Sequence, residues 1–226
     1  MAMKILRSYN RNLTDLLSDA YKWEYTDIND NNKTSLSKKP KFFLTKFQWF
    51  LFVVAIFLVF SCPNAFEKDL AGYIISALSL FVGLLFTLVV SLFDKFSNTD
   101  FSKYKQNVNV ELYPFGVRLK NFFKKTIILT LYTAVVAIAC ILLLTFIVLY
   151  DKASISIDVF AIISNYKVYS VVYLFKVFAL VSYRVVLFYM LLNFINITLK
   201  LITSFYDYMI SEINKVSLKW YALFWF

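Results

Sequence analysis

The chain contains no histidine, and it has only 3 glycines, 3 prolines and 2 cysteines in 226 residues. Without histidine there is no Ser-His or Cys-His nucleophile pair, no histidine metal ligand and no histidine general base. So few glycines cannot form a glycine-rich phosphate loop, and the two cysteines form no CxxC motif. These absences predict that the protein is not an enzyme and that it holds no metal and no cofactor.

Charge is also scarce, since charged residues make up 17% of the chain and hydrophobic residues 60%. An average globular chain has roughly 45–50% apolar and about 25% charged residues. The shortage of glycine and proline favours long helices without breaks. The fold class that we predict is an all-α integral membrane protein with four transmembrane helices, short amphipathic cytoplasmic helices and a long C-terminal helix.

Four apolar runs have about the 20 residues that a helix needs to cross the hydrocarbon of a bilayer. We expect these spans at residues 42–62, 70–93, 126–150 and 171–195. Together they make a transmembrane domain that includes a cytoplasmic loop, and this domain lies between an N-terminal amphipathic helix with its linker and a C-terminal helix with an aromatic tail. The corresponding ranges are 42–195 for the domain, 94–125 for the loop, 1–41 for the N-terminal part and 196–226 for the C-terminal part.

Lys and Arg are distributed unevenly among the segments outside these spans. Nine lie in residues 1–46, counting Lys46 at the inner end of the first span, seven in 94–125 and three after 195, whereas the other two loops together hold three. Because cytoplasmic segments of membrane proteins are rich in Lys and Arg, this asymmetry predicts that both termini and the central loop are cytoplasmic. The same rule explains the formal net charge of +10, so we expect no nucleic-acid partner. The predicted location is a bacterial inner membrane.

The segments outside the spans are patterned as well. Apolar residues recur at helical spacing from Ile5 to Tyr21, which predicts the amphipathic N-terminal helix. Alternation around residues 108–112 indicates a short strand, and the sequence YPFG at 113–116 indicates a turn. The stretch RLKNFFKK at 118–125 is typical of an interfacial segment whose phenylalanines enter lipid. Partner or lipid contacts are therefore expected at Arg118, Lys120, Lys124, Lys125, Trp220 and Trp225.

Two of the expected spans carry a face of small and hydroxyl-bearing residues. At about 100° per residue, six residues of the second span fall within about 120° of one another. They are Gly72, Ser76, Ser79, Gly83, Thr87 and Ser91. The third span has a similar face, made of Thr126, Thr130, Thr133, Ala137 and Cys140. Small residues let helices approach closely, so each face fits either packing within the chain or a pore-lining or subunit-contact surface in an oligomer.

The fourth span carries Arg184 well inside its apolar run. A charge at that depth costs a few kcal/mol or more unless it is paired or hydrated. Arg184 therefore either serves a pore, gate or cavity, or it snorkels because the span boundary is shifted. Asn193 and Asn196 follow near the inner end. The candidates for a pore or cavity are thus Arg184, Thr87, Ser91, Asn193 and Asn196, and those for a packing or oligomer face are Gly72, Ser76, Ser79, Gly83, Thr130 and Thr133.

Two functions fit these features. The first is an oligomeric channel or membrane-perturbing effector, because short-looped spans, hydroxyl faces and an intramembrane arginine occur without a catalytic set. The second is a membrane scaffold or sensor subunit that recruits and regulates a cytosolic protein partner through the N-terminal helix, the basic loop and the aromatic tail. The lipid bilayer is a partner in both.

The layout resembles that of the small four-helix membrane subunits of bacterial anti-phage defence systems of the Hailong and Kiwa types. The parts that carry this resemblance are the polar N-terminal helix, the second span GYIISALSLFVGLLFTLVVSLFDKF (residues 72–96) and the basic central loop. The resemblance implies an antiviral role and a homo-oligomer, such as a tetramer, that permeabilises the inner membrane or reports on it.

Overall fold

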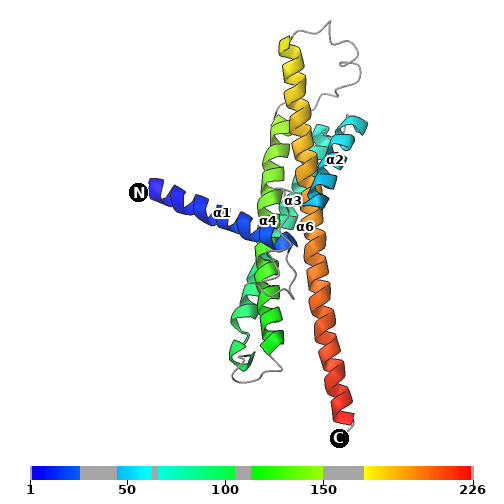
Figure 1. The fold of residues 1–226 in the computed structure, drawn as a ribbon. Coiled ribbons are helices and arrows are strands. Elements are labelled where there is room, and N and C mark those ends of the chain that lie inside the picture. Colours follow the sequence, from blue (N-terminus) through cyan, green and yellow to red (C-terminus); the bar gives the residue numbers. More distant parts are fainter. Residues whose placement is uncertain (1, 26–44, 63–65, 105–112, 150–170, 225–226) are drawn as a thin grey trace. The chain divides into compact units, whose positions relative to one another are not determined.

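The computed structural model describes residues 2–25, 45–62, 66–104, 113–149 and 171–224 (Figure 1). Every regular element in these ranges is a helix, which confirms the prediction of an all-helical protein for them. The elements are α1 (Ala2–Tyr25), α2 (Lys46–Ser61), α3 (Lys68–Ser97), a 3-10 helix η2 (Phe101–Tyr104), α4 (Tyr113–Leu149) and α6 (Val171–Phe224). The strand predicted around residues 108–112 lies outside the described residues.

Three helices are long and apolar enough to cross a membrane, namely α3, α4 and the 172–210 part of α6. α2 is apolar but has only 16 residues. At 1.5 Å per residue it is about 24 Å long, which is less than the hydrocarbon thickness of about 30 Å. The structure therefore supports three of the four predicted spans by length and composition, and the first predicted span stays a prediction.

A capping box fixes the start of α2. The Thr45 hydroxyl accepts a hydrogen bond from the Gln48 backbone N–H at 3.3 Å, and Gln48 Oε1 accepts one from the Thr45 N–H at 2.9 Å. Such a pair satisfies two N–H groups that have no partner inside the helix. The helix consequently begins at Lys46, after the start at residue 42 that the apolar run predicted, and residues 42–44 lie outside the described ranges.

The first turn of α4 corrects the turn that the sequence predicted at 113–116. These residues are helical, and Pro114 fits there because a first-turn residue has no intrahelical use for its N–H. Gly116 is buried against Tyr104, and a Cβ at Gly116 would overlap the Tyr104 side chain. Since α3 also continues to Ser97, the connection between α3 and α4 is shorter than the predicted loop 94–125.

The chain divides into two compact units. Unit 1 comprises residues 1–39, 86–132 and 196–226. Its core contains Leu92, Leu119, Phe122 and Phe123. Phe122 and Phe123 are only 3% and 1% exposed, so the prediction that they enter lipid is wrong. They are buried because the helix runs straight through this segment and turns them towards the aromatic rings of the same unit.

Unit 2 comprises residues 40–85 and 133–195. Aromatic contacts join its helices, including Phe81 with Phe194 at 5.6 Å between ring centroids and Phe52 with Tyr189 at 6.0 Å. The Tyr183 hydroxyl donates a hydrogen bond to the Leu143 carbonyl, which ties α6 to α4. Both polar and aromatic contacts therefore hold this unit together.

α6 runs for 54 residues without a break, from yellow to red in Figure 1. The predicted fourth span, 171–195, forms the first part of this helix. The apolar part of α6 reaches Ile210, so the predicted long C-terminal helix is continuous with the span.

Candidate functional site

α3 contacts the rest of the chain along one narrow seam. Its buried residues are Ala71, Leu78, Leu85 and Leu92, and each follows the previous one by seven positions. At about 100° per residue these four side chains lie within about 60° of one another. Half-buried residues, including Leu88, Val89 and Phe96, flank this seam, and the opposite side of α3 is largely exposed among the described residues.

The side of α3 opposite this seam carries the small and hydroxyl-bearing residues. In unit 2 these are Gly72, Ser76, Ser79 and Gly83, and in unit 1 they are Thr87 and Ser91. All are exposed except Gly72, which is half-buried. The same projection places two exposed carboxylates on this side, because Asp69 and Asp94 fall within about 20° of Ser76. We call these eight residues the polar face of α3.

The glycines on the polar face have open space around them. A Cβ built at Gly72 or at Gly83 would have no atom of another segment within 4 Å. Packing within the chain, one of the two interpretations that the sequence allows, therefore does not account for these small residues in the described part of the protein.

Two serines of the polar face, Ser76 and Ser79, donate their hydroxyl hydrogens to carbonyls of their own helix. Ser76 Oγ donates to the Gly72 carbonyl at 3.0 Å, and Ser79 Oγ donates to the Ile75 carbonyl at 2.8 Å. A serine that donates in this way keeps its oxygen lone pairs for an acceptor role. The outward surface therefore offers oxygen acceptors, which suit cations or hydrogen-bond donors.

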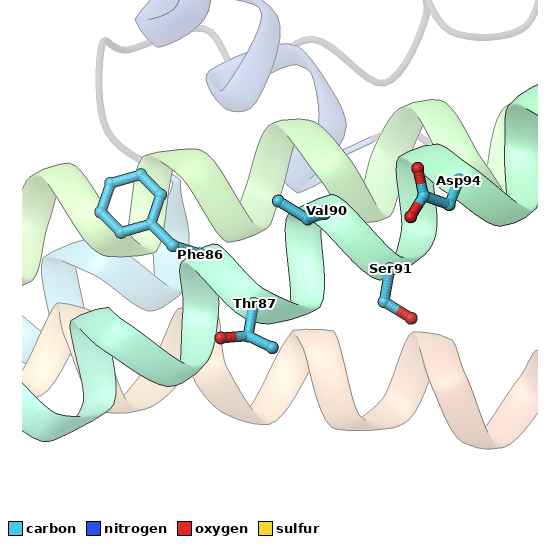
Figure 2. A pocket seen from close by; sticks show the side chains of 5 residues that line it. All are labelled: Phe86, Thr87, Val90, Ser91 and Asp94. Atoms are coloured by element: carbon cyan, nitrogen blue, oxygen red, sulfur yellow. The ribbon is translucent and has the colours of Figure 1, made fainter.

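The end of α3 that belongs to unit 1 carries an open groove of about 550 Å³. The described residues that line it are Phe86, Thr87, Val90, Ser91 and Asp94. Figure 2 shows the Thr87 and Ser91 hydroxyls projecting to one side of the helix, with Asp94 in the following turn. Two of the predicted pore residues thus share a groove with a carboxylate.

The corresponding face of α4 has a different environment. Thr126, Thr130, Thr133, Ala137 and Cys140 are all 0% exposed. Thr130 Oγ1 donates to the Thr126 carbonyl at 2.7 Å, whereas the buried Thr126 Oγ1 has no hydrogen-bond partner in the described part of the chain. Thr130 and Thr133 therefore pack inside the protein, as the first of the two interpretations requires.

Arg184 and the two asparagines of α6 are also buried. Arg184 is 5% exposed and takes part in at least one polar, charged or ring interaction. Among the described residues, Asn193 Oδ1 and Asn196 Nδ2 have no hydrogen-bond partner. These three side chains lie within the packing of the chain, and their part in a pore or cavity stays a prediction.

Most of the predicted lipid or partner contacts lie on the first turns of α4. Arg118, Lys120 and Lys124 are exposed, and Lys125 is half-buried. Trp220 belongs to α6, but its side chain lies outside the described part, as does the whole of Trp225.

Asp69 and Asp94 are the residues that sequence reasoning missed. The predicted second span, 70–93, ends one residue short of each acid, so neither belongs to it. The signal was present in the sequence, because continuing the helical projection by one residue in each direction places both acids on the polar face. Among the described residues no group of three or more His, Cys, Asp or Glu side chains could hold a metal ion.

The fold and its three apolar helices indicate an α-helical membrane protein. No protein-family model, no curated protein and no solved structure matches the chain.

Proposed function

We propose that the chain is a non-enzymatic membrane protein that associates with copies of itself, and that the polar face of α3 lines a path for cations through the assembly. One observation carries this proposal: an apolar helix long enough to span a bilayer turns its hydroxyls, glycines and carboxylates away from its own chain. Polar and charged groups in contact with hydrocarbon are unfavourable. A second copy or a hydrated path relieves that cost.

The order of residues along the polar face suits this role. Asp69 and Asp94 are 25 positions apart, about 37 Å along a helix axis, so they bracket a hydrocarbon layer of about 30 Å. The hydroxyls and glycines lie between them. Rings of Asp or Glu favour cations in channels, and small residues allow neighbouring helices to approach closely. The outward lone pairs of Ser76 and Ser79 would then contact the passing ion or its water.

The topology and setting belong to the same proposal. α2 would be the fourth span, with flanking lipid thinned to match a short helix. Both termini would lie in the cytoplasm of a bacterium, because basic segments of membrane proteins are retained on the cytoplasmic side. The layout resemblance to anti-phage defence subunits adds phage infection as the trigger of the assembly, and the buried Arg184 is the candidate for a gating residue within unit 2.

Self-association through the polar face is tested by Gly83→Leu. Leucine has room in the single chain because nothing lies within 4 Å of a Cβ at this position. The matched control is Ala77→Leu, since Ala77 is exposed on the same helix but lies about 100° away from Ser76. We expect Gly83→Leu to raise the dissociation constant of the oligomer by at least about tenfold, measured by cross-linking over a range of protein-to-lipid ratios. Equal effects of the two variants would contradict the proposed interface.

Cation selectivity is tested by reversal potentials in planar bilayers under a salt gradient. We expect the full-length protein to conduct cations in preference to anions, and Asp94→Asn to shift the reversal potential towards zero. Asp207→Asn, which neutralises an exposed acid on α6, serves as the control and should leave the potential unchanged. An oligomer that remains silent under all conditions would contradict the channel and leave the scaffold or sensor subunit as the better function.

A further inference from the structure

The first turns of α4 concentrate positive charge without any acid. Residues 113–149 contain no Asp or Glu, and their four cations all lie between 118 and 125, just before the long apolar run. Arg118, Lys120 and Lys124 are exposed, and none of them forms an ion pair with another described residue. From this surface we infer that the start of α4 binds the anionic headgroups of phospholipids in the adjacent leaflet.

The cations flank the buried stripe of the helix on both sides. With Leu119 taken as 0°, Phe122 and Phe123 lie at about −60° and +40°. Arg118 and Lys125 then fall at about −100° and −120°, whereas Lys120 and Lys124 fall at about +100° and +140°. Each flank therefore holds two cations, and neither pair competes with the core for the same side of α4.

Aromatic packing fixes this orientation. The Phe122 ring stacks on Tyr208 at 4.2 Å with 10° between the planes, and it meets the Phe205 ring edge-on at 5.7 Å. Phe123 packs against Phe96 at 5.5 Å. The helix cannot rotate without breaking these contacts, so the cations keep fixed positions around the axis of α4.

The depth of these cations matches a headgroup layer. Because α4 is one helix from Tyr113 to Leu149, its cations stand in fixed register with the apolar run that starts at Thr126. Lys120 and Lys124 are about 6 Å apart along the axis, and Arg118 and Lys125 about 10 Å. The polar layer on each side of a bilayer is about 5–8 Å thick. Lysine stems can extend along apolar surface while the ammonium groups reach phosphate.

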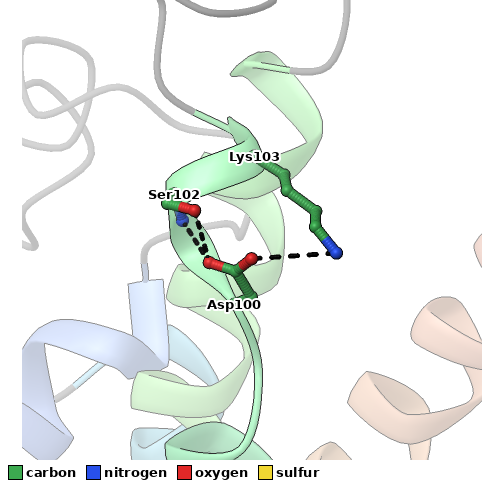
Figure 3. A network of polar contacts seen from close by, with 3 residues as sticks. All are labelled: Asp100, Ser102 and Lys103. Atoms are coloured by element: carbon green, nitrogen blue, oxygen red, sulfur yellow. Dashed lines mark hydrogen bonds and ion pairs between the residues drawn. The ribbon is translucent and has the colours of Figure 1, made fainter.

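The acid that directly precedes η2 in unit 1 already has partners in its own turn. Asp100 accepts hydrogen bonds from the Ser102 N–H at 3.0 Å and the Ser102 hydroxyl at 2.5 Å, and it lies 3.7 Å from Lys103 Nζ (Figure 3). Lys95 Nζ lies 5.6 Å from the centre of the Tyr208 ring. The carboxylate nearest in sequence to η2 is thus already engaged, and Lys95 adds a further cation to the same unit.

The test uses the full-length protein in phosphatidylcholine vesicles that contain a trace of spin-labelled lipid. Electron paramagnetic resonance gives the association constant of spin-labelled phosphatidylglycerol relative to phosphatidylcholine. We expect this ratio to exceed one and to fall by about twofold or more in Lys120→Gln/Lys124→Gln, because each cation near an anionic surface contributes to lipid attraction. The charge-conserving pair Lys120→Arg/Lys124→Arg should keep the ratio of the wild type.

A second pair separates a local surface from general attraction by net charge. Lys68→Gln/Lys176→Gln removes the same charge from exposed positions at the starts of α3 and α6, and we expect a much smaller fall in the ratio. Equal falls in both pairs, or a ratio of one in the wild type, would overturn the inference. Inorganic phosphate should lower the ratio no more than chloride of the same ionic strength, and a larger loss with phosphate would mean that the surface takes the free anion instead. The helical circular dichroism signal of each variant verifies its fold. If the double Gln variant unfolds, the lipid association ratio is measured on the two single Gln variants instead.

Discussion

The small-residue faces of α3 and α4 look alike in the sequence but have opposite environments in the structure. On α3 the face is exposed and its glycines have open space, whereas on α4 every member from Thr126 to Cys140 is fully buried. In the most apolar stretch of α3, 11% of the residues are buried inside the chain, against 44% in that of α4. Among the described residues, the face of α4 therefore packs within its own chain, whereas that of α3 does not.

The difference comes from the large residues of each helix. On α3 the buried leucines recur every seven positions and lie opposite the polar face, so the helix contacts its chain on one side only. On α4 the large buried residues Leu129, Leu144 and Ile147 accompany the small ones. Small residues alone do not identify an interface between subunits, and the position of the apolar seam decides which side of a helix is used within the chain.

The sharpest way to break this comparison is to enlarge one residue on each face. Ala137→Leu adds three carbons to a position that is 0% exposed, and we expect it to lower the free energy of unfolding by about 1–3 kcal/mol through overpacking. Gly83→Leu adds a larger side chain to open space. The free energy of unfolding of the monomer should therefore stay unchanged or rise slightly. Unfolding in mixed micelles by detergent titration measures both. A similar loss in the two variants would mean that the polar face of α3 is packed within the chain.

A second comparison concerns two glycines with different surroundings. Gly116→Ala places a Cβ against the Tyr104 side chain, and we expect a loss of about 1–2 kcal/mol because the η2 turn must shift. Gly72→Ala enters open space within a helix, where alanine is favoured over glycine by about 0.5–1 kcal/mol. The thermal unfolding midpoint should thus fall in the first variant and rise in the second. A rise of the midpoint in both variants would show that the Tyr104 side chain moves away from position 116 at little cost.

The helices were largely predictable, but their ends and their partners were not. Apolar runs and scarce glycine and proline predict long helices wherever they occur, and the structure confirms three such helices and the continuation of α6. The start of α2 depends on the Thr45–Gln48 capping box, and the start of α4 at Tyr113 depends on Pro114 being acceptable in a first turn. A pattern of turn residues could not distinguish that first turn from a loop.

The sequence predicted which small residues of α3 share one side of the helix, but not whether that side is buried or exposed. Helical spacing grouped the six small residues of α3 correctly on one side, but it could not say whether that side is buried, because burial depends on contacts between distant segments. The Phe122–Phe123 pair shows the same limit. Next to basic residues it has the pattern of an interfacial segment, yet long-range contacts with Tyr208 and Phe96 bury it.

Smaller effects sharpen the description of the buried face of α4. Thr126→Val replaces a buried hydroxyl that has no hydrogen-bond partner in the described part of the chain, so we expect unchanged stability or a gain of up to about 1 kcal/mol. Thr130→Val removes the hydrogen bond to the Thr126 carbonyl and should cost about 0.5–1.5 kcal/mol. The difference between the two variants in the free energy of reversible unfolding tests whether the Thr130 hydroxyl is hydrogen-bonded and the Thr126 hydroxyl is not. If both lose stability equally, Thr126 has a bonded partner such as a buried water.

The smallest effect concerns Asp100, in the connection between α3 and α4. Hydrogen bonds from the Ser102 hydroxyl and N–H hold the pKa of Asp100 below its ordinary value of 3.8. A carboxyl group with a lowered pKa in the folded state stabilises the fold above its ordinary pKa, and this contribution disappears as the pH falls through the lowered value. Asp100 is exposed, so the effect on unfolding should be small. We expect acidification below about pH 4 to lower the unfolding midpoint slightly more in the wild type than in Asp100→Asn, with Asp207→Asn behaving as the wild type. Identical acid sensitivity of all three proteins would show that the Asp100–Ser102 contact does not stabilise the turn that leads from α3 into α4.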